Sequence, residues 1–524
     1  EGSSHTLRAR HCRPRPDGGE PVGWTYAVPG VVSWSVIAAC VLGLVFFQPT
    51  WQWIAAGFVA YLMLYMWVMV AFALIAELKL RRWAKRDWTA AENEPGPFGF
   101  APADVHHAVV VPNFKEPLNV LERTIEGLAV QHRASERIVL VLGMEEREPG
   151  AREKGEALAR RYEGRFERII VSLHPGGLPG ELACKASNQS WASIEARRVT
   201  VEEMGIPLEH ITLSTCDADS VFHPKYFAAL SEMFARDERR DATFWQAPLL
   251  YYNNIWDVPA PIRYSTWFIH AGQLAELANP IYEPLPISTY TLSMRLAEQM
   301  DWWDPAVISE DWHVYLGAMF ALDGDVSVTS VFLPVSADAT DGKTTWQALI
   351  NRYLQVLRHA WGAEDVGYIL KSMIAERRLP RPLTAFRFVQ VLHDHVMRVA
   401  GWCGLVSGYV LSFLARDTAF ASVRVESATG VNVLGTLFAV MFTVGGVGIA
   451  SVIVVELLRN PPPRHWPFLR SVLEIALMWF SAPFIGLFLA VAPAVHAQTK
   501  LMFGLPLAWR VTPKRLVERF GDAA

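Results

Sequence analysis

Cysteine is scarce in this chain, and charge is sparse for its length. Only five of the 524 residues are cysteine, and they show neither a CxxC pair nor zinc-type spacing, which argues against a disulfide framework. Charged residues make up 19% of the chain and hydrophobic residues 52%, a balance that excludes disorder and leaves room for membrane segments. The formal net charge of −4 offers no basic field for coating nucleic acid, so we expect no nucleic-acid partner.

Long apolar runs are present near both ends of the chain. The first two extend over 31–47 and 51–76, close to the roughly 20 residues that a helix needs to cross the hydrocarbon layer. We expect two transmembrane helices within 29–77, after a polar tail over 1–28 that does not resemble a cleavable signal. Arginines precede the first run and a Lys/Arg cluster follows the second. The positive-inside rule then predicts a multi-pass plasma-membrane protein whose tail and residues after 86 are cytoplasmic.

Apolar runs return after about residue 381, over 400–414, 431–458 and 472–495. Three spans would leave the basic tail, residues 498–524, outside the cell, contrary to the charge rule. We therefore expect interfacial and transmembrane helices within 385–497, with one run interfacial or re-entrant. The charged and histidine residues between 393 and 398 make the lead-in to the first run a candidate in-plane amphipathic helix.

The middle of the chain, residues 102–380, alternates short β-branched runs with segments of helical composition. Strands are predicted over 107–111, 137–142, 168–173 and 210–215, with helices between them over 118–132, 151–162 and 183–197. This alternation indicates βαβ units in a mostly parallel sheet. The predicted fold class is therefore α/β and Rossmann-like, with an α-helical transmembrane region, and ligands should bind at the carboxyl ends of the strands.

Acidic residues lie just beyond the fourth predicted strand and at the start of a later helix. Asp217 and Asp219 leave the strand at positions i and i+2, a spacing that can hold Mg²⁺ or Mn²⁺ with ligand positions left open for diphosphate oxygens. Glu310 and Asp311 follow Ser309, a predicted N-cap. Taken alone, a solvated turn explains the first pair and the helix dipole explains the second.

Taken in this order between membrane runs, the motifs resemble the processive membrane glycosyltransferases of family 2, the relatives of cellulose, chitin and hyaluronan synthases. That family presents, on a GT-A fold, a Pro-x-Tyr-Asn-Glu strand end, an acid after the second strand, Asp-x-Asp, Glu-Asp and Gln-x-x-Arg-Trp. The resemblance covers residues 102 to about 365 and the hydrophobic flanks. It implies a cytoplasmic GT-A domain over 102–380 that takes sugar from a nucleotide sugar, most commonly a UDP-sugar.

Position by position, the resemblance assigns a role to each motif residue. Asp311 would be the catalytic base, with Glu310 beside it. Asp219 would ligate the metal, and Asp217 would contact the metal or the donor nucleotide. Acceptor contacts would come from Gln355, Trp312 and Trp361, because apolar ring faces suit sugar rings. Further donor contacts would come from Pro112, Glu116, Glu145, Glu146, Lys185, Asn188 and Arg358.

Three motifs depart from the family pattern. The first, PNFKE, has Phe-Lys in place of Tyr-Asn, and after the second strand VLGMEERE offers glutamate instead of aspartate. In the last, QVLRHAWG, His359 stands where tryptophan is expected and Trp361 lies two residues later. This last departure leaves two acceptors open, a growing polysaccharide with possible export or a lipid carrier that receives a single sugar.

The chemistry favours sugar transfer over hydrolysis. Asp311 would take the acceptor proton, and the metal with Arg358 or Lys185 would stabilise the leaving diphosphate. The helix N-terminus is expected to keep Asp311 ionised, which suits a base. A glycosidase would need a second, protonated carboxyl, and no partner stands out. A nucleotide-binding transporter or scaffold remains as an alternative of another class, although Glu456 and Glu474 are the nearest candidates for intramembrane charge.

Overall fold

A seven-stranded mixed sheet organises the middle of the chain in this computed structural model, which describes residues 23–375, 381–407 and 433–507. Its strand order is β3-β2-β1-β4-β8-β6-β9. The strand pairs from β3 to β4 and the pair β6–β9 are parallel, whereas β8 runs antiparallel to both β4 and β6. The prediction of a mostly parallel sheet is therefore confirmed, with one antiparallel strand inserted. The strands are β1 (His106–Pro112), β2 (Ile138–Glu145), β3 (Arg168–His174), β4 (Ile211–Thr215), β6 (Thr243–Gln246), β8 (Tyr290–Ser293) and β9 (Ser327–Ser330).

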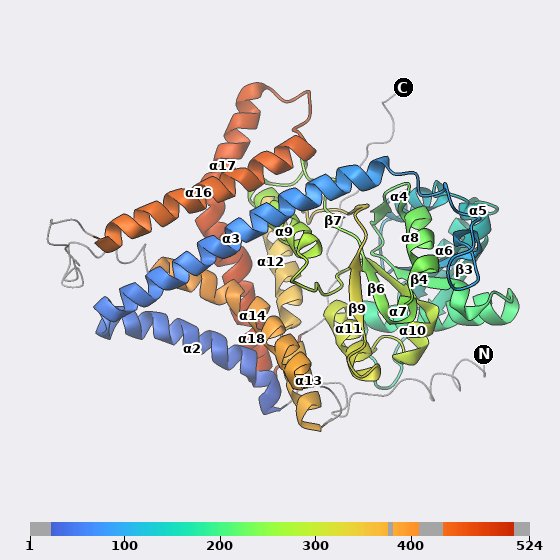
Figure 1. Ribbon diagram of the computed structural model, residues 1–524, viewed down its shortest axis with the longest axis horizontal. Coiled ribbons are helices and arrows are strands. Elements are labelled where there is room, and N and C mark those ends of the chain that lie inside the picture. The colour runs from blue at the N-terminus through green and yellow to red at the C-terminus, as the bar shows by residue number, and fades with distance from the viewer. Residues whose placement is uncertain (1–22, 376–380, 408–432, 508–524) are drawn as a thin grey trace.

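Helices cover both faces of this sheet, giving a GT-A-like three-layer domain (Figure 1). Along β1, Val109 and Val111 enter one buried cluster while Ala108 and Val110 enter the other, as the two-residue period of a strand requires. The helices of the domain are α4 (Leu118–Ala129), α5 (Ala134–Arg137), α6 (Ala151–Arg161), α7 (Lys185–Arg197), α8 (Tyr226–Arg236), α9 (Ala260–Ala278), α10 (Met294–Gln299), α11 (Glu310–Ala321), α12 (Thr345–Trp361) and α13 (Glu364–Ala375).

A second, three-stranded sheet brings the site loops together. Its order is β5-β10-β7, formed by β5 (Val221–Phe222), β10 (Val335–Ser336) and β7 (Leu249–Leu250). β10 is antiparallel to β5 and parallel to β7. Because each strand borders a loop, this small sheet gathers the segments that follow β4, β7 and β10.

The remaining helices lie on one side of the GT-A-like domain (Figure 1). They are α2 (Trp24–Phe46), α3 (Gln48–Lys85), α14 (Arg381–Leu405), α16 (Val433–Arg459), α17 (Phe468–Gly486) and α18 (Ala492–Met502). Within the described residues, four stretches are long and apolar enough to cross a membrane: Trp24–Phe46, Thr50–Lys85, Ala439–Arg459 and Phe484–Met502. The predicted tail as far as residue 22, the run over 400–414 beyond residue 407, and the basic tail from residue 508 lie outside the described residues.

Helix α3 continues into the GT-A-like domain and is fixed there. Just beyond its end, Arg86 Nη2 lies 2.5 Å from Glu232 Oε1 of α8. Lys225 Nζ donates to the Ala84 carbonyl oxygen at 2.9 Å. The same helix therefore belongs to both the membrane region and the GT-A-like domain.

Close packing of α2 against α18 predicts an effect of one added methyl group. A Cβ at Gly30 would lie 2.5 Å from the Gln498 backbone oxygen, whereas a Cβ at Gly57 of α3 would meet no atom within 4 Å. Gly30→Ala should therefore reduce the free energy of unfolding by about 1–3 kcal/mol through overpacking. The melting temperature of the detergent-solubilised protein should fall accordingly. Gly57→Ala should be neutral or stabilising, because Ala is the better helix former. Equal melting temperatures would show that α2 does not pack on α18 in this way.

Candidate active site

The acidic pair predicted after β4 lies at the carboxyl end of that strand, next to the antiparallel strand β8. Ser288, which precedes β8, donates its hydroxyl to Asp217 Oδ2 at 2.6 Å. The other carboxylate oxygen, Oδ1, lies 2.8 Å from Lys185 Nζ. The Asp217 side chain is 38% exposed, so it remains open to a ligand.

Lys185 is the first residue of α7 and joins the two acidic motifs. Its ammonium lies 2.8 Å from Asp217 and 3.0 Å from Glu310 Oε1, and it donates to the Ser288 carbonyl oxygen at 3.2 Å. Burial opposes its charge, but Asp217, Glu310 and Asp311 together raise its pKa well above the usual value. Lys185 is therefore a fixed cation inside an acidic cluster rather than a solvated surface lysine.

Asp311 occupies the first turn of α11 beside this cluster. Burial, then the charge of Glu310, raise the pKa of Asp311 to about 7, against the opposing effects of Lys185 and a hydrogen bond from the Ser288 backbone. The expectation that the helix N-terminus would dominate is therefore wrong, because desolvation and a like charge outweigh the dipole. Asp311 Oδ1 is buried and accepts no hydrogen bond from the described residues. A carboxyl group in this state can take a proton near neutral pH.

Asp219 is 3% exposed and is held by groups that sequence reasoning missed. Its Oδ2 accepts the Asp338 backbone N–H at 2.9 Å, just after β10. Asn253 Nδ2 donates to the Asp219 carbonyl oxygen at 3.1 Å and to Asp338 Oδ1 at 3.0 Å. Arg123 pairs with the same Asp338 oxygen at 2.5 Å. These partners lie 34 to 215 residues from Asp219 or Asp338 in sequence, so no local motif indicated them.

The carboxyl ends of β1 and β2 form the other wall, where several predicted donor residues lie. Pro112 ends β1, and Asn188 Nδ2 donates to the Gly143 carbonyl oxygen at 2.7 Å. Glu145 is 2% exposed and pairs with Arg147, whose guanidinium lies 4.5 Å from the Phe114 ring centroid. Burial raises the pKa of Glu145, and Arg147 opposes the rise.

Two further predicted donor residues contact this wall through hydrogen bonds. Glu146 Oε2 accepts the Gly176 backbone N–H at 3.2 Å. The Glu116 carbonyl oxygen accepts from Lys154 Nζ at 3.0 Å. Glu116 and Glu146 thus follow the carboxyl ends of β1 and β2, close to Glu145 in the fold.

Helix α12 carries the predicted Gln355 and Arg358. Gln355 Oε1 accepts from Arg352 Nη1 at 2.6 Å and also from the Thr340 hydroxyl. Ser309 does not cap α11 with its side chain. Its hydroxyl instead donates to the Arg358 carbonyl oxygen at 3.1 Å, which ties α11 to α12.

The two predicted aromatic platforms differ in exposure. Trp361 is 2% exposed and packs in an apolar cluster with Ile308 and Leu357, so protein side chains cover most of its surface. Trp312 is partly buried, with its ring centroid 5.2 Å from that of His395 in α14. Of the two, Trp312 is the more accessible candidate for acceptor contact.

Oxygen ligands for a divalent ion are available at Asp219 and Asp217. Carboxylates after a strand have the chemistry that Mg²⁺ and Mn²⁺ prefer. Within the described ranges, no three His, Cys, Asp or Glu side chains converge as a metal cage. An ion held here would therefore need further ligands such as diphosphate oxygens or water.

Comparison with known proteins relates part of the chain to glycosyltransferases. Residues 213–453 match the model of the glycosyl transferase family group 2. No curated protein matches the chain. Among solved structures, the mannosyltransferase PcManGT from Pyrobaculum calidifontis, in complex with GDP-Man and Mn²⁺, is 15% identical with a TM-score of 0.38, covering 78% of this chain and 99% of its own.

Two other structures are similar at a comparable level. GalNAc-T7, with UDP, GalNAc and Mn²⁺, is 10% identical with a TM-score of 0.33, covering 56% of this chain and 58% of its own. TarS residues 1–349 from S. aureus are 11% identical with a TM-score of 0.30, covering 69% of this chain and 94% of their own. The family match over residues 213–453 and the GT-A-like mixed sheet together support a glycosyltransferase.

Proposed function

We propose that the chain is an inverting, metal-dependent transferase that moves sugar from a UDP-sugar to a growing polysaccharide at the cytoplasmic face of the plasma membrane. The observation that carries this proposal is the Lys185 ammonium between Asp217 and Glu310, beside the poised carboxyl of Asp311. This arrangement supports the proposal that the diphosphate-binding and proton-accepting groups share one cluster. The four apolar spans support a membrane location.

The donor diphosphate would lie at the carboxyl end of β4. Asp219 and Asp217 would hold a divalent ion there, and when bound this ion supplies Lewis-acid stabilisation of the leaving diphosphate. Lys185 and Arg358 would add charge-assisted hydrogen bonds to its oxygens. Pro112, Glu145 and the neighbouring wall would bind the nucleotide. Asp311 would accept the proton of the attacking acceptor hydroxyl.

The raised pKa of Asp311 predicts a specific pH profile. A base must be ionised, and a carboxyl group with a pKa of about 7 is protonated below that value. We expect kcat/KM to fall about tenfold per unit as the pH drops below about 7, and to level off above it. Initial rates at saturating and at limiting donor concentration over roughly pH 5.5 to 8.5 would measure the fall of kcat/KM on the acid side. A flat profile would contradict the assignment of Asp311 as the base.

The donor and the metal can be identified together. Purified full-length protein in lipid nanodiscs would be incubated with a panel of nucleotide sugars, with and without Mn²⁺ or Mg²⁺, and the released nucleoside diphosphate measured. We expect release with one UDP-sugar, dependent on the metal. No release and no transfer with any nucleotide sugar would contradict the proposed function.

A second candidate acceptor is a lipid carrier that receives one sugar. The burial of Trp361 favours it, because the displaced tryptophan of the last motif does not present a platform for a polymer. Labelled donor would separate the two candidates. A ladder of products supports elongation, whereas a single-sugar lipid product supports the carrier.

A further inference from the structure

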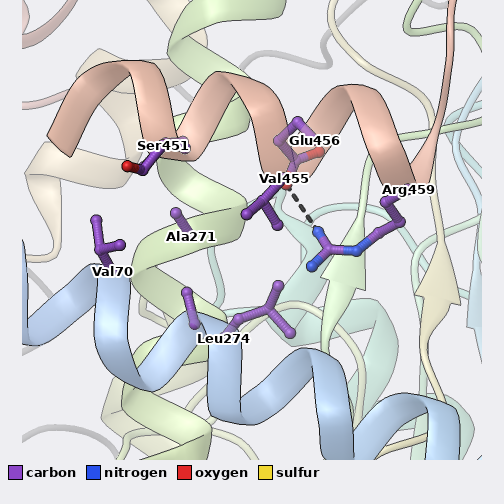
Figure 2. A pocket seen from close by; sticks show the side chains of 9 residues that line it. Val70, Ala271, Leu274, Ser451, Val455, Glu456 and Arg459 are labelled. Atoms are coloured by element: carbon purple, nitrogen blue, oxygen red, sulfur yellow. Dashed lines mark hydrogen bonds and ion pairs between the residues drawn. The ribbon is translucent and has the colours of Figure 1, made fainter. Parts of the chain in front are cut away.

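A buried hydrogen-bonded cluster around Glu456 links the membrane helix α16 to the domain. Glu456 of α16 is 1% exposed, and its Oε2 lies 3.3 Å from His270 Nδ1 of α9. The Tyr252 hydroxyl donates to the same oxygen at 2.7 Å. Arg459 Nη1 donates to Glu456 Oε1 at 2.8 Å (Figure 2). Ionisable residues in apolar helices are costly, and their partners usually indicate why they are kept.

The other nitrogen of His270 holds the backbone beside the active site. The Tyr251 N–H donates to His270 Nε2 at 2.9 Å. Nε2 must therefore lack a proton, so Nδ1 carries it and points toward Glu456. The imidazole is completely buried and its ring is stacked on that of Tyr251, with centroids 5.8 Å apart and planes 9° apart. Both ends of the ring are thus fixed, one by α16 and one by Tyr251.

Tyr251 is close enough to Asp217, Asp219 and Asp311 for their charges to act on it. It follows β7, two residues before the Asn253 that bonds Asp219 and Asp338. Burial raises the pKa of Tyr251 to about 12, and Asp217, Asp219 and Asp311 act in the same direction, against Arg352. Its phenol therefore stays protonated as a hydrogen-bond donor within reach of the fields of all three acids.

The surroundings of Glu456 leave no room for a ligand of its own. The cavity beside it, between α3, α9 and α16, has a volume of ≈ 10 Å³ and is lined mainly by apolar side chains such as Val70, Ala271 and Leu274 (Figure 2). A space of this size holds at most about one water molecule. The polar groups of Glu456 therefore act on His270, Tyr252 and Arg459.

We propose that Tyr251 contacts the sugar during transfer, and that His270 and Glu456 are positioning residues that hold Tyr251 in place from the membrane helix. This inference rests on the proposed function, because the metal-side acids and the base define where the sugar lies. A neutral phenol at that point can donate to a sugar hydroxyl while its ring packs against the sugar.

Variants of full-length protein in nanodiscs test the link. His270→Ala should lower kcat/KM about 10- to 100-fold, the scale expected when a site group is displaced by about 1 Å, while UDP affinity stays nearly unchanged. His270→Gln, whose carbonyl can still accept the Tyr251 N–H, should recover part of the loss. Tyr251→Phe should lower kcat while keeping the ring. Glu77→Gln is the matched control, because it removes the Arg459 ion pair between α3 and α16 without touching His270.

Two outcomes would overturn the proposal. If Glu77→Gln lowers kcat/KM as much as His270→Ala, the cluster only ties helices together. Hydrogen exchange gives a readout independent of activity: the Tyr251 amide should exchange faster in His270→Ala and unchanged in Glu77→Gln. Unchanged exchange in His270→Ala would refute the positioning link, whereas absence of transfer by the unaltered protein would refute the proposed function instead.

Discussion

Replacing Asp311 by Asn is expected to lower kcat by about 10²- to 10⁴-fold, the usual contribution of a positioned general base. The substitution keeps the size of the side chain and removes only its ability to accept a proton. Because Asp217, Asp219 and Lys185 are untouched, UDP should bind with nearly unchanged affinity. Measuring single-turnover transfer and UDP binding on the same preparation would separate chemistry from binding.

The stability of the Asp311→Asn variant should move in the opposite direction to its activity. The pKa of the folded carboxyl is raised from 3.8 to about 7, so the folded protein loses stability as the pH rises between these two values, and the whole loss is present at pH 8. An amide has no such cost, and the variant should melt at the same temperature as the unaltered protein or higher at pH 8. Asp325→Asn, at a side chain that is 77% exposed, should change neither the activity nor the melting temperature. Full activity of Asp311→Asn would remove Asp311 from the mechanism.

Asp219→Asn is expected to lower kcat/KM by about 10²- to 10³-fold, comparable to removing one preorganised stabiliser of a leaving group. The amide oxygen can still accept the Asp338 N–H, which is 2.9 Å from Oδ2, so the loop should keep its conformation. The negative charge that would hold the divalent ion is lost. The remaining activity should require a much higher Mn²⁺ concentration.

A Mn²⁺ titration of activity is the decisive measurement for Asp219. The unaltered protein and Asp325→Asn should give the same half-saturating Mn²⁺ concentration. If Asp219→Asn kept that concentration while losing activity, Asp219 would serve the loop structure and not the metal. If Asp219→Asn kept both the half-saturating Mn²⁺ concentration and the activity of the unaltered protein, the proposed metal site would be wrong.

Local patterns were sufficient to predict the frame of the domain. The β-branched run over 107–111 became β1, and the helical segment 151–162 became α6, at almost the same bounds. Their periodicity depends only on neighbouring residues, so it can be read along the chain. The antiparallel strand β8 was not predicted, since nothing in Tyr290–Ser293 itself states which strand it will join.

The chemistry of the site was only partly predictable for the same reason. Asp217 and Asp219 were recognisable by spacing, but their contacts with Ser288 and Asp338 come from loops 71 and 119 residues away. The pKa of Asp311 was expected in the wrong direction, because burial and the placement of Glu310 are tertiary properties. The presence of a tryptophan at position 361 does not by itself distinguish a ring that binds sugar from a ring that packs in the core.

The length of α3 sets a physical limit on where this enzyme works. Its 38 residues make a rod of about 57 Å at 1.5 Å per residue, nearly twice the roughly 30 Å hydrocarbon layer. Since its far end is fixed to α8, the catalytic sheet is kept at a constant stand-off from the lipid surface. Under the proposed lipid-carrier function, an acceptor anchored in the cytoplasmic leaflet would be met by lateral diffusion in two dimensions, whereas the soluble donor would arrive from the bulk in three.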